Sequence, residues 1–191
     1  MKYIKTKTII FITILFLISL TGVLLITMSK KNNIKKSNQE KQILIIETIK
    51  GKIEIEMLNT IAPKHVNRIA ELVKEKFYNG VIFHRVIPGF MAQTGDPTGT
   101  GMSGSGKKIK SEFSDYNYTR GTVGMARTAD PNSADSQFFI CYDDCSHLNG
   151  SYTVWGQVVK GMKVVDNIEP GEPPSKPDSI LTAKIKKIKS K

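Results

Sequence analysis

The stretch VIFHRVIPGFMAQTGD, residues 81–96, consists of two short apolar runs separated by a turn at Pro88-Gly89. Apolar runs of about four to eight residues, bounded by glycine or proline, are typical of buried strands. The stretch therefore predicts strands over 81–87 and 90–94. A plain buried strand does not explain why His84 and Arg85 stand side by side in the first run.

Similar short runs lie on both sides of this stretch. Before it, Ile53, Ile55 and Met57 alternate with charged residues directly after Lys50-Gly51, which predicts a hairpin turn followed by a strand. After it, apolar or alternating runs occupy residues 121–126, 137–142, 152–159 and 180–188. Many short strands with glycine-rich connections indicate an antiparallel barrel or sandwich.

Two segments have the spacing of helices. Residues 62–80 carry Pro63 near the start, apolar side chains at intervals of three and four, and Asn79-Gly80 at the end. This pattern predicts an amphipathic helix of about four turns, on which His65 is expected to be exposed. A second helix is predicted over 160–170, where Pro170-Gly171 stops it.

The first 41 residues differ in composition from the rest. Residues 1–7 are basic, residues 8–29 are uncharged, and residues 30–41 are mostly lysine, asparagine, serine and glutamine. At ~1.5 Å per residue, a helix over 8–29 is long enough to cross a ~30 Å hydrocarbon core, so we expect a membrane anchor or uncleaved signal followed by a polar tether.

Two features of the sequence give opposite indications of the orientation of this anchor. The lysines after the apolar stretch outnumber those before it, which does not favour export of the remaining chain. A basic start followed by an apolar run is nevertheless typical of secretory signals. We therefore expect a single-pass protein of the cell membrane with residues 42–191 outside the cytoplasm.

The net charge of +11 does not by itself indicate nucleic-acid binding. Eight lysines and one glutamate within residues 1–41 contribute +7, which leaves +4 for the rest of the chain. A nucleic-acid-binding domain needs a concentrated basic face, so we expect no nucleic-acid partner.

The two cysteines, Cys141 and Cys145, lack the further cysteine or histidine ligands of a tetrahedral metal site. No metal is expected. The cysteines are two separate thiols or, in an oxidising compartment, a bonded pair.

Arg85 is the residue that points to function. On a regular strand it shares a face with Val81, Phe83 and Ile87, and burying an arginine without partners is strongly unfavourable. Either this face is partly open and Arg85 forms an ordinary surface ion pair, or apolar groups wall a shallow pocket with the guanidinium at its rim.

The neighbouring sequence favours the pocket. Phe90 and Met91 follow on the next run, and the segments SQFFIC (136–141) and HLNG (147–150) supply further apolar groups. Gln93 is placed to accept a hydrogen bond from the guanidinium of Arg85 and to hold it.

Five blocks of the sequence, taken together, resemble successive blocks of the cyclophilin family of peptidyl-prolyl cis-trans isomerases. They are FHRVIPGFMAQTGDPTGTG (83–101), IKSEFSD (109–115), GTVGMAR (121–127), NSADSQFFI (132–140) and HLNGSYTVWGQVVKGMKVVDNI (147–168). The resemblance covers roughly residues 42–190. It implies a mainly β fold, an eight-stranded antiparallel closed barrel capped by two helices. It also implies an enzyme that accelerates X-Pro rotation in protein clients, assists their folding and needs no cofactor.

The resemblance further implies the site. Arg85 would be the catalytic residue, donating to the prolyl nitrogen as the amide twists. Phe138 and Phe139 point opposite ways on a strand, and we assign Phe138 to the core and Phe139 to the proline slot. The other substrate-binding residues would be His84, Phe90, Met91, Gln93, Ala126, Arg127, Gln137, His147, Leu148 and Tyr152.

Two of these positions depart from the best-known family members. His147 stands where they carry a tryptophan that supports cyclosporin binding, and Tyr152 stands where they often carry histidine. Loss of the indole removes apolar area and a fixed donor, so the resemblance does not carry cyclosporin sensitivity over to this chain.

An alternative function is a non-catalytic module that binds proline-containing peptides on the same fold. That alternative predicts a gap in the catalytic set, and none of the key residues is missing. We expect a monomer whose partners are proline-containing segments of folding proteins and, through the N-terminal helix, the membrane.

Overall fold

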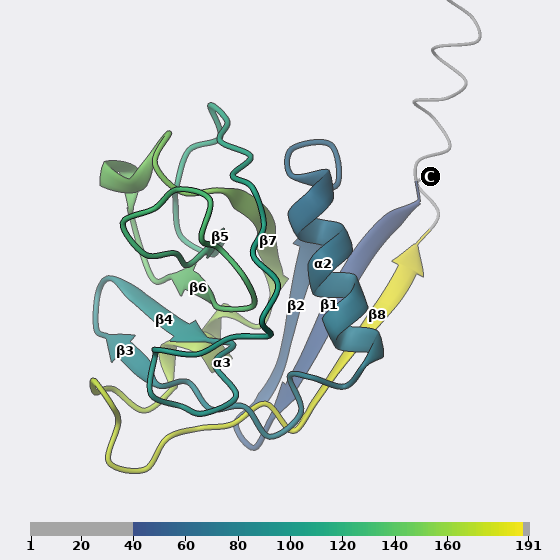
Figure 1. The fold of residues 1–191 in the computed structure, drawn as a ribbon. Coiled ribbons are helices and arrows are strands. Elements are labelled where there is room, and N and C mark those ends of the chain that lie inside the picture. The colour runs from purple at the N-terminus through teal and green to yellow at the C-terminus, as the bar shows by residue number, and fades with distance from the viewer. Residues whose placement is uncertain (1–39, 189–191) are drawn as a thin grey trace, which may run out of the picture. The chain divides into compact units, whose positions relative to one another are not determined.

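Antiparallel strands make up much of the described chain, residues 40–188, in the computed structural model (Figure 1). One sheet contains eight strands in the order β3-β4-β6-β5-β7-β2-β1-β8. The mainly β prediction is confirmed. The strands are β1 (Lys41–Thr48), β2 (Gly51–Met57), β3 (Arg85–Ile87), β4 (Met91–Thr94), β5 (Thr122–Met125), β6 (Phe138–Cys141), β7 (Val154–Lys160) and β8 (Thr182–Ile188).

Strands β3 and β8 lie at the two ends of this order, and main-chain hydrogen bonds join the irregular segments that precede them. The N–H of Gly80 donates to the carbonyl of Ile180 at 2.7 Å, and the N–H of Ile180 donates to Val81 at 2.9 Å. The N–H of Phe83 donates to Asp178 at 2.9 Å. The chain before β3 therefore lies along the chain before β8. In a closed barrel β3 and β8 would pair as a regular ladder, and here these few hydrogen bonds take the place of that ladder.

This arrangement corrects the strand predicted over 81–87. Regular structure begins only at Arg85, because the preceding residues bond to the segment before β8. Val81 and Phe83 are buried, whereas Arg85 and Ile87 are half-buried. The expected single face shared by all four side chains is therefore divided, with Val81 and Phe83 in the interior and Arg85 and Ile87 partly exposed.

Alternation along β1 and β2 builds the centre of the main core. Ile53, Ile55 and Met57 are buried, as their period of two predicts. Ile69 and Leu72 of helix α2 (Pro63–Lys74) join the same cluster. Full burial of each such side chain contributes roughly 1.5–3 kcal/mol, so this cluster fixes the frame on which the site is built.

Both helices are shorter than predicted. Helix α2 ends at Lys74 because Lys76 adopts the left-handed conformation (φ 58°) and the N–H of Phe77 returns to the carbonyl of Leu72 at 2.9 Å. Glycine is the usual residue at this position, so no sequence signal marked the end. Helix α3 spans only Met162–Asp166, and a 3₁₀ turn, η1, spans Ser146–Leu148. Helix α2 packs against β7 and β8, and α3 packs against β2.

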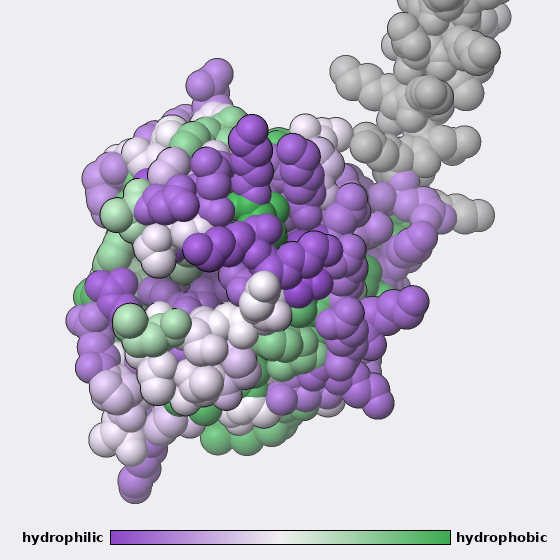
Figure 2. Space-filling view, in the orientation of Figure 1, coloured by the Kyte–Doolittle hydropathy of each residue, from purple (hydrophilic) through white to green (hydrophobic). Residues whose placement is uncertain are grey.

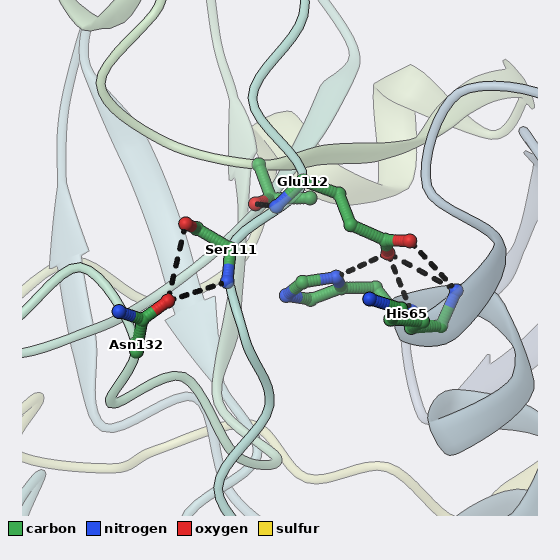
Figure 3. Close-up of polar contacts among 6 residues, drawn as sticks. His65, Ser111, Glu112 and Asn132 are labelled. Atoms are coloured by element: carbon green, nitrogen blue, oxygen red, sulfur yellow. Dashed lines mark hydrogen bonds and ion pairs between the residues drawn. The ribbon is translucent and has the colours of Figure 1, made fainter.

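His65 is buried, contrary to the exposed position expected for it. Its ring is 0% exposed, and Nδ1 lies 2.7 Å from a carboxylate oxygen of Glu112. The same carboxylate accepts the N–H groups of Lys64 and His65, each at 3.0 Å (Figure 3). Glu112 thus caps the N-terminus of α2, where Ala62 offers no capping side chain. Because Glu112 is far along the chain, helix periodicity alone could not reveal this burial.

Acidification is expected to destabilise the domain through this contact. Burial lowers the pKa of His65 despite its hydrogen bond to Glu112. Burial acts to raise the pKa of Glu112, but hydrogen bonds from His65 and Lys64 outweigh it and lower the pKa. Both groups therefore bind protons more weakly in the folded state, so stability falls as the pH falls. The loss of stability due to His65 begins below about pH 6.5, and the loss due to Glu112 begins below about pH 4.5.

The check is the Tm of the full chain between pH 7.5 and pH 4. In His65→Gln the decline between pH 7 and pH 5 is expected to be smaller than in the parent, whereas His147→Gln, at an exposed position, should retain it. An unchanged decline in His65→Gln would show that another group titrates.

The predicted basic n-region (1–7), anchor (8–29) and nearly all of the tether (30–41) lie outside the described residues. Within residues 40–188, no helix is both long and apolar enough to cross a membrane. Figure 2 shows that hydrophilic side chains cover most of the visible face of this part and that apolar residues appear in separate patches between them.

Candidate active site

A hairpin of β3 and β4 positions the two polar side chains singled out from the sequence. Pro88-Gly89 lies in its turn, and Gly89 has the positive φ (75°) that a tight turn often needs. Arg85 and Gln93 are directly paired across the two strands. Paired residues project to the same face of a sheet, so the hairpin turns both side chains toward one side.

That side opens into a cavity of about 270 Å³. Its lining comes from β3, β4 and the turn between them, from β6 and η1, and from the loops after β5 and η1. Every residue that lines it belongs to the set predicted from the sequence. The lining residues are Arg85, Phe90, Met91, Gln93, Ala126, Arg127, Phe139, Leu148 and Tyr152.

The three remaining predicted residues lie next to this cavity. Gln137 lines a second cavity of about 270 Å³, which shares Gln93, Ala126 and Arg127 with the first. His147 packs its ring 5.3 Å from that of Phe90, measured between centroids. His84 is buried behind Arg85, and its burial lowers its pKa, so its imidazole is neutral at pH 7.

The adjacent phenylalanines separate as predicted. Phe138 is fully buried in the main core, where its ring packs edge to face against Tyr78 and Trp155. Phe139 belongs to a smaller cluster and forms a wall of the cavity between the rings of Tyr118 and Tyr152. The period of a strand thus sends one ring to the core and the next to the site.

Arg127 is held at the rim of the cavity by its own contacts. Its Nε and Nη2 donate to the carbonyl of Ser151 at 3.1 and 2.8 Å. Its guanidinium carbon lies 4.5 Å from the centroid of the Tyr152 ring. These contacts fix Arg127 and Tyr152 together, so the rim next to Phe139 is preformed.

Gln93 does not hold Arg85 in the expected way. Its amide nitrogen donates to Gln137 at 2.8 Å, and Gln137 in turn donates to the carbonyls of Gly101 and Ser103 at 3.0 and 2.7 Å. Nε of Arg85 donates instead to Glu172 at 2.6 Å. The sequence prediction missed Glu172, because PGEPPSKPD reads locally as a helix stop and a loop.

The cysteines lie behind the slot as free thiols. Cys141 and Cys145 are both buried beside Met91, Phe139 and Leu148. Burial raises the pKa of both thiols, which keeps them protonated at neutral pH. Within residues 40–188 no group of three or more histidine, cysteine, aspartate or glutamate side chains is arranged to hold a metal ion.

Comparison with known proteins identifies the family. The family described as "Cyclophilin type peptidyl-prolyl cis-trans isomerase/CLD" matches residues 43–189. The chain belongs to the cyclophilin family. The resemblance drawn from the five sequence blocks is thereby confirmed, and this cyclophilin is an enzyme that isomerises peptide bonds preceding proline.

Curated relatives and solved structures agree with this assignment. The cyclophilin is 48% identical over 160 residues to a probable peptidyl-prolyl cis-trans isomerase of Brucella suis, covering 74% of this chain and 81% of that one. It is 43% identical to a peptidyl-prolyl cis-trans isomerase of Synechococcus elongatus, covering 74% and 94%. A crystal structure of a Cryptosporidium parvum cyclophilin matches with a TM-score of 0.72 and 30% identity, covering 78% and 98%.

Proposed function

We propose that Arg85 is the catalytic residue of this cyclophilin. Rotation of an X-Pro bond passes through a state without amide resonance, which costs roughly 18–20 kcal/mol and makes the uncatalysed step take ~10–100 s. About a thousand events per second requires an acceleration of ~10⁵, or about 7 kcal/mol. No nucleophile or proton transfer is needed for this reaction.

The guanidinium supplies stabilisation that is selective for the twisted state. The lone pair of the prolyl nitrogen becomes an acceptor only when the amide twists, so a donor aimed at it binds the transition state better than the ground state. The observation that carries the proposal is the cavity itself, because Arg85 forms part of the wall that also contains Phe139 and Leu148.

The same cavity accounts for binding of the substrate. Phe90, Met91, Phe139 and Leu148 provide an apolar slot for the proline ring. The peptide would pair as an added strand with the main chain at Ala126, whose N–H already bonds to Gln137 at 2.9 Å and leaves the carbonyl for the peptide. A Cryptosporidium parvum cyclophilin that is 31% identical, with a TM-score of 0.71, has a crystal structure in the presence of the dipeptide Ala-Pro.

The slot is tested by exchange NMR with a short Ala-Pro peptide and the full chain. Cis-trans exchange should accelerate in proportion to enzyme concentration, and the amide signals of Phe139, Leu148 and Ala126 should shift on binding. The same peptide with alanine in place of proline should shift them far less. Shifts confined to another surface would remove the proline slot from this cavity.

We also propose that the cyclophilin is a single-pass membrane protein and a monomer, with its isomerase domain outside the cytoplasm. The uncharged residues 8–29 and the polar residues 30–41 support an anchor and a tether. There it would act on proline-containing segments of exported proteins as they fold.

Membrane fractions should retain the chain after alkaline carbonate washing, and protease added to intact spheroplasts should remove residues 42–191. Release by carbonate would exclude a spanning anchor, and protection from protease would reverse the proposed orientation.

A further inference from the structure

Arg85, the proposed catalytic residue, is bound by a carboxylate from a loop near the end of the domain's sequence. Nε of Arg85 lies 2.6 Å from Oε2 of Glu172, which is 87 residues later in the chain. The side chains of Arg85 and Glu172 are 41% and 51% exposed. An ion pair this exposed contributes little to folding stability, so stability alone is a weak reason for its geometry.

The backbone brings Glu172 to this position by a short antiparallel bridge. The N–H of Val86 donates to the carbonyl of Gly171 at 2.8 Å, and the N–H of Gly171 donates back to Val86 at 2.9 Å. Residues flanking such a pair are cross-strand neighbours, here Arg85 and Glu172. The carboxylate is therefore placed by two main-chain hydrogen bonds to the strand that carries Arg85.

The loop that supplies Glu172 is itself fixed. Gly171 has a φ of 144°, and a Cβ atom on it would lie 2.6 Å from Cα of Pro174, so other residues are excluded there. At the other end of the loop, the buried carboxylate of Asp178 accepts the N–H of Glu169 at 2.8 Å and pairs with Lys50 at 2.9 Å. Contacts at Gly171 and Asp178 thus fix both ends of the loop that carries Glu172.

We propose that Glu172 is a positioning residue for the isomerase reaction. Its carboxylate accepts the hydrogen bond from Nε of Arg85, and the terminal nitrogens of the guanidinium remain available at the wall of the slot. Arginine has four rotatable side-chain bonds, and a charge-assisted hydrogen bond to a fixed carboxylate removes much of that freedom before substrate arrives. Gln93 does not perform this task, because within residues 40–188 the side-chain hydrogen bond of Arg85 goes to Glu172 and not to the amide oxygen of Gln93. The inference rests on the catalytic role proposed for Arg85.

The test compares variants of the full chain by kcat and KM in exchange NMR. Glu172→Ala is expected to lower kcat about tenfold with KM nearly unchanged, because ground-state binding in the slot is preserved. Glu172→Asp should recover part of the loss. Glu169→Gln, in the same loop and without an ion pair in the described chain, is the matched control and should retain the parent kcat. The Tm of each variant should stay close to that of the parent.

Two further measurements separate positioning from a structural role. The Nε–H signal of Arg85, identified by its absence in Arg85→Lys, should move upfield in Glu172→Ala and stay in place in Glu169→Gln. Glu172→Ala should also have little additional effect in an Arg85→Lys background, because the carboxylate acts through the guanidinium.

The outcomes distinguish this inference from the proposed function. If Arg85→Lys lowers kcat but Glu172→Ala does not, the positioning role is overturned and the catalytic role of Arg85 stands. A higher kcat in Glu172→Ala would also overturn the positioning role, because the carboxylate would then hinder the guanidinium of Arg85 instead of positioning it. If Arg85→Lys leaves kcat unchanged, the catalytic assignment itself fails.

Discussion

Replacing Arg85 by lysine is expected to lower kcat/KM for X-Pro isomerisation by about 10²-fold, and replacing it by alanine by up to ~10³-fold, the range seen when one transition-state donor is removed. Lysine keeps the positive charge. It lacks the planar fork that lets one nitrogen bond to Glu172 while the others face the prolyl nitrogen. The larger part of the loss is therefore expected from the change of geometry.

The measurement is exchange NMR of an Ala-Pro peptide with the full chain, which needs no coupled protease. Arg120→Lys is the matched control, because Arg120 is also a half-exposed arginine paired with a carboxylate, that of Asp166 at 2.7 Å, and it lies outside the slot. Arg120→Lys should retain kcat/KM within about twofold. Equal activities of Arg85→Lys and Arg120→Lys would show that the guanidinium of Arg85 is not the donor.

Short-range patterns in the sequence were sufficient to predict the parts of the site carried by neighbouring residues. The β3–β4 hairpin follows from two apolar runs around Pro88-Gly89, and strand periodicity separates Phe138 from Phe139. Assembly of the slot, however, needs β4, β6 and the turn η1 to meet. The resemblance to a known family supplied that information, because periodicity alone left a barrel and a sandwich both open.

Contacts between distant segments were the ones that sequence reasoning missed. His65 is buried because Glu112 reaches it from a loop 47 residues away, and Arg85 is held by Glu172 from 87 residues away. Neither partner has a local signal, since an exposed-looking glutamate in a polar loop is ordinary. The end of α2 at Lys74 was missed for a different reason, because a lysine occupies the left-handed position usually taken by glycine.

The two adjacent phenylalanines allow stability and activity to be separated by equivalent substitutions. Phe138→Ala is expected to lower the free energy of unfolding by about 3–5 kcal/mol, because it leaves a cavity in the fully buried packing against Tyr78 and Trp155. The slot is lined by the opposite face of β6, so the kcat/KM of the molecules that remain folded should stay within a few-fold of the parent.

Phe139→Ala is expected to have the opposite effect, a smaller loss of stability and a larger loss of activity. The ring borders the slot, so water can enter the space it leaves, and the loss of unfolding free energy should be smaller, about 1–3 kcal/mol. Without the ring, the proline loses an apolar wall, so KM should rise and kcat/KM should fall by about tenfold or more, equivalent to ~1.4 kcal/mol. Urea unfolding and exchange NMR at 10 °C measure both quantities on the same samples.

If the two variants lost stability and activity in the same proportion, β6 would not divide its faces between core and slot. An activity loss confined to Phe139→Ala, with the larger stability loss in Phe138→Ala, would establish that division, because the substitutions remove the same side chain from adjacent positions.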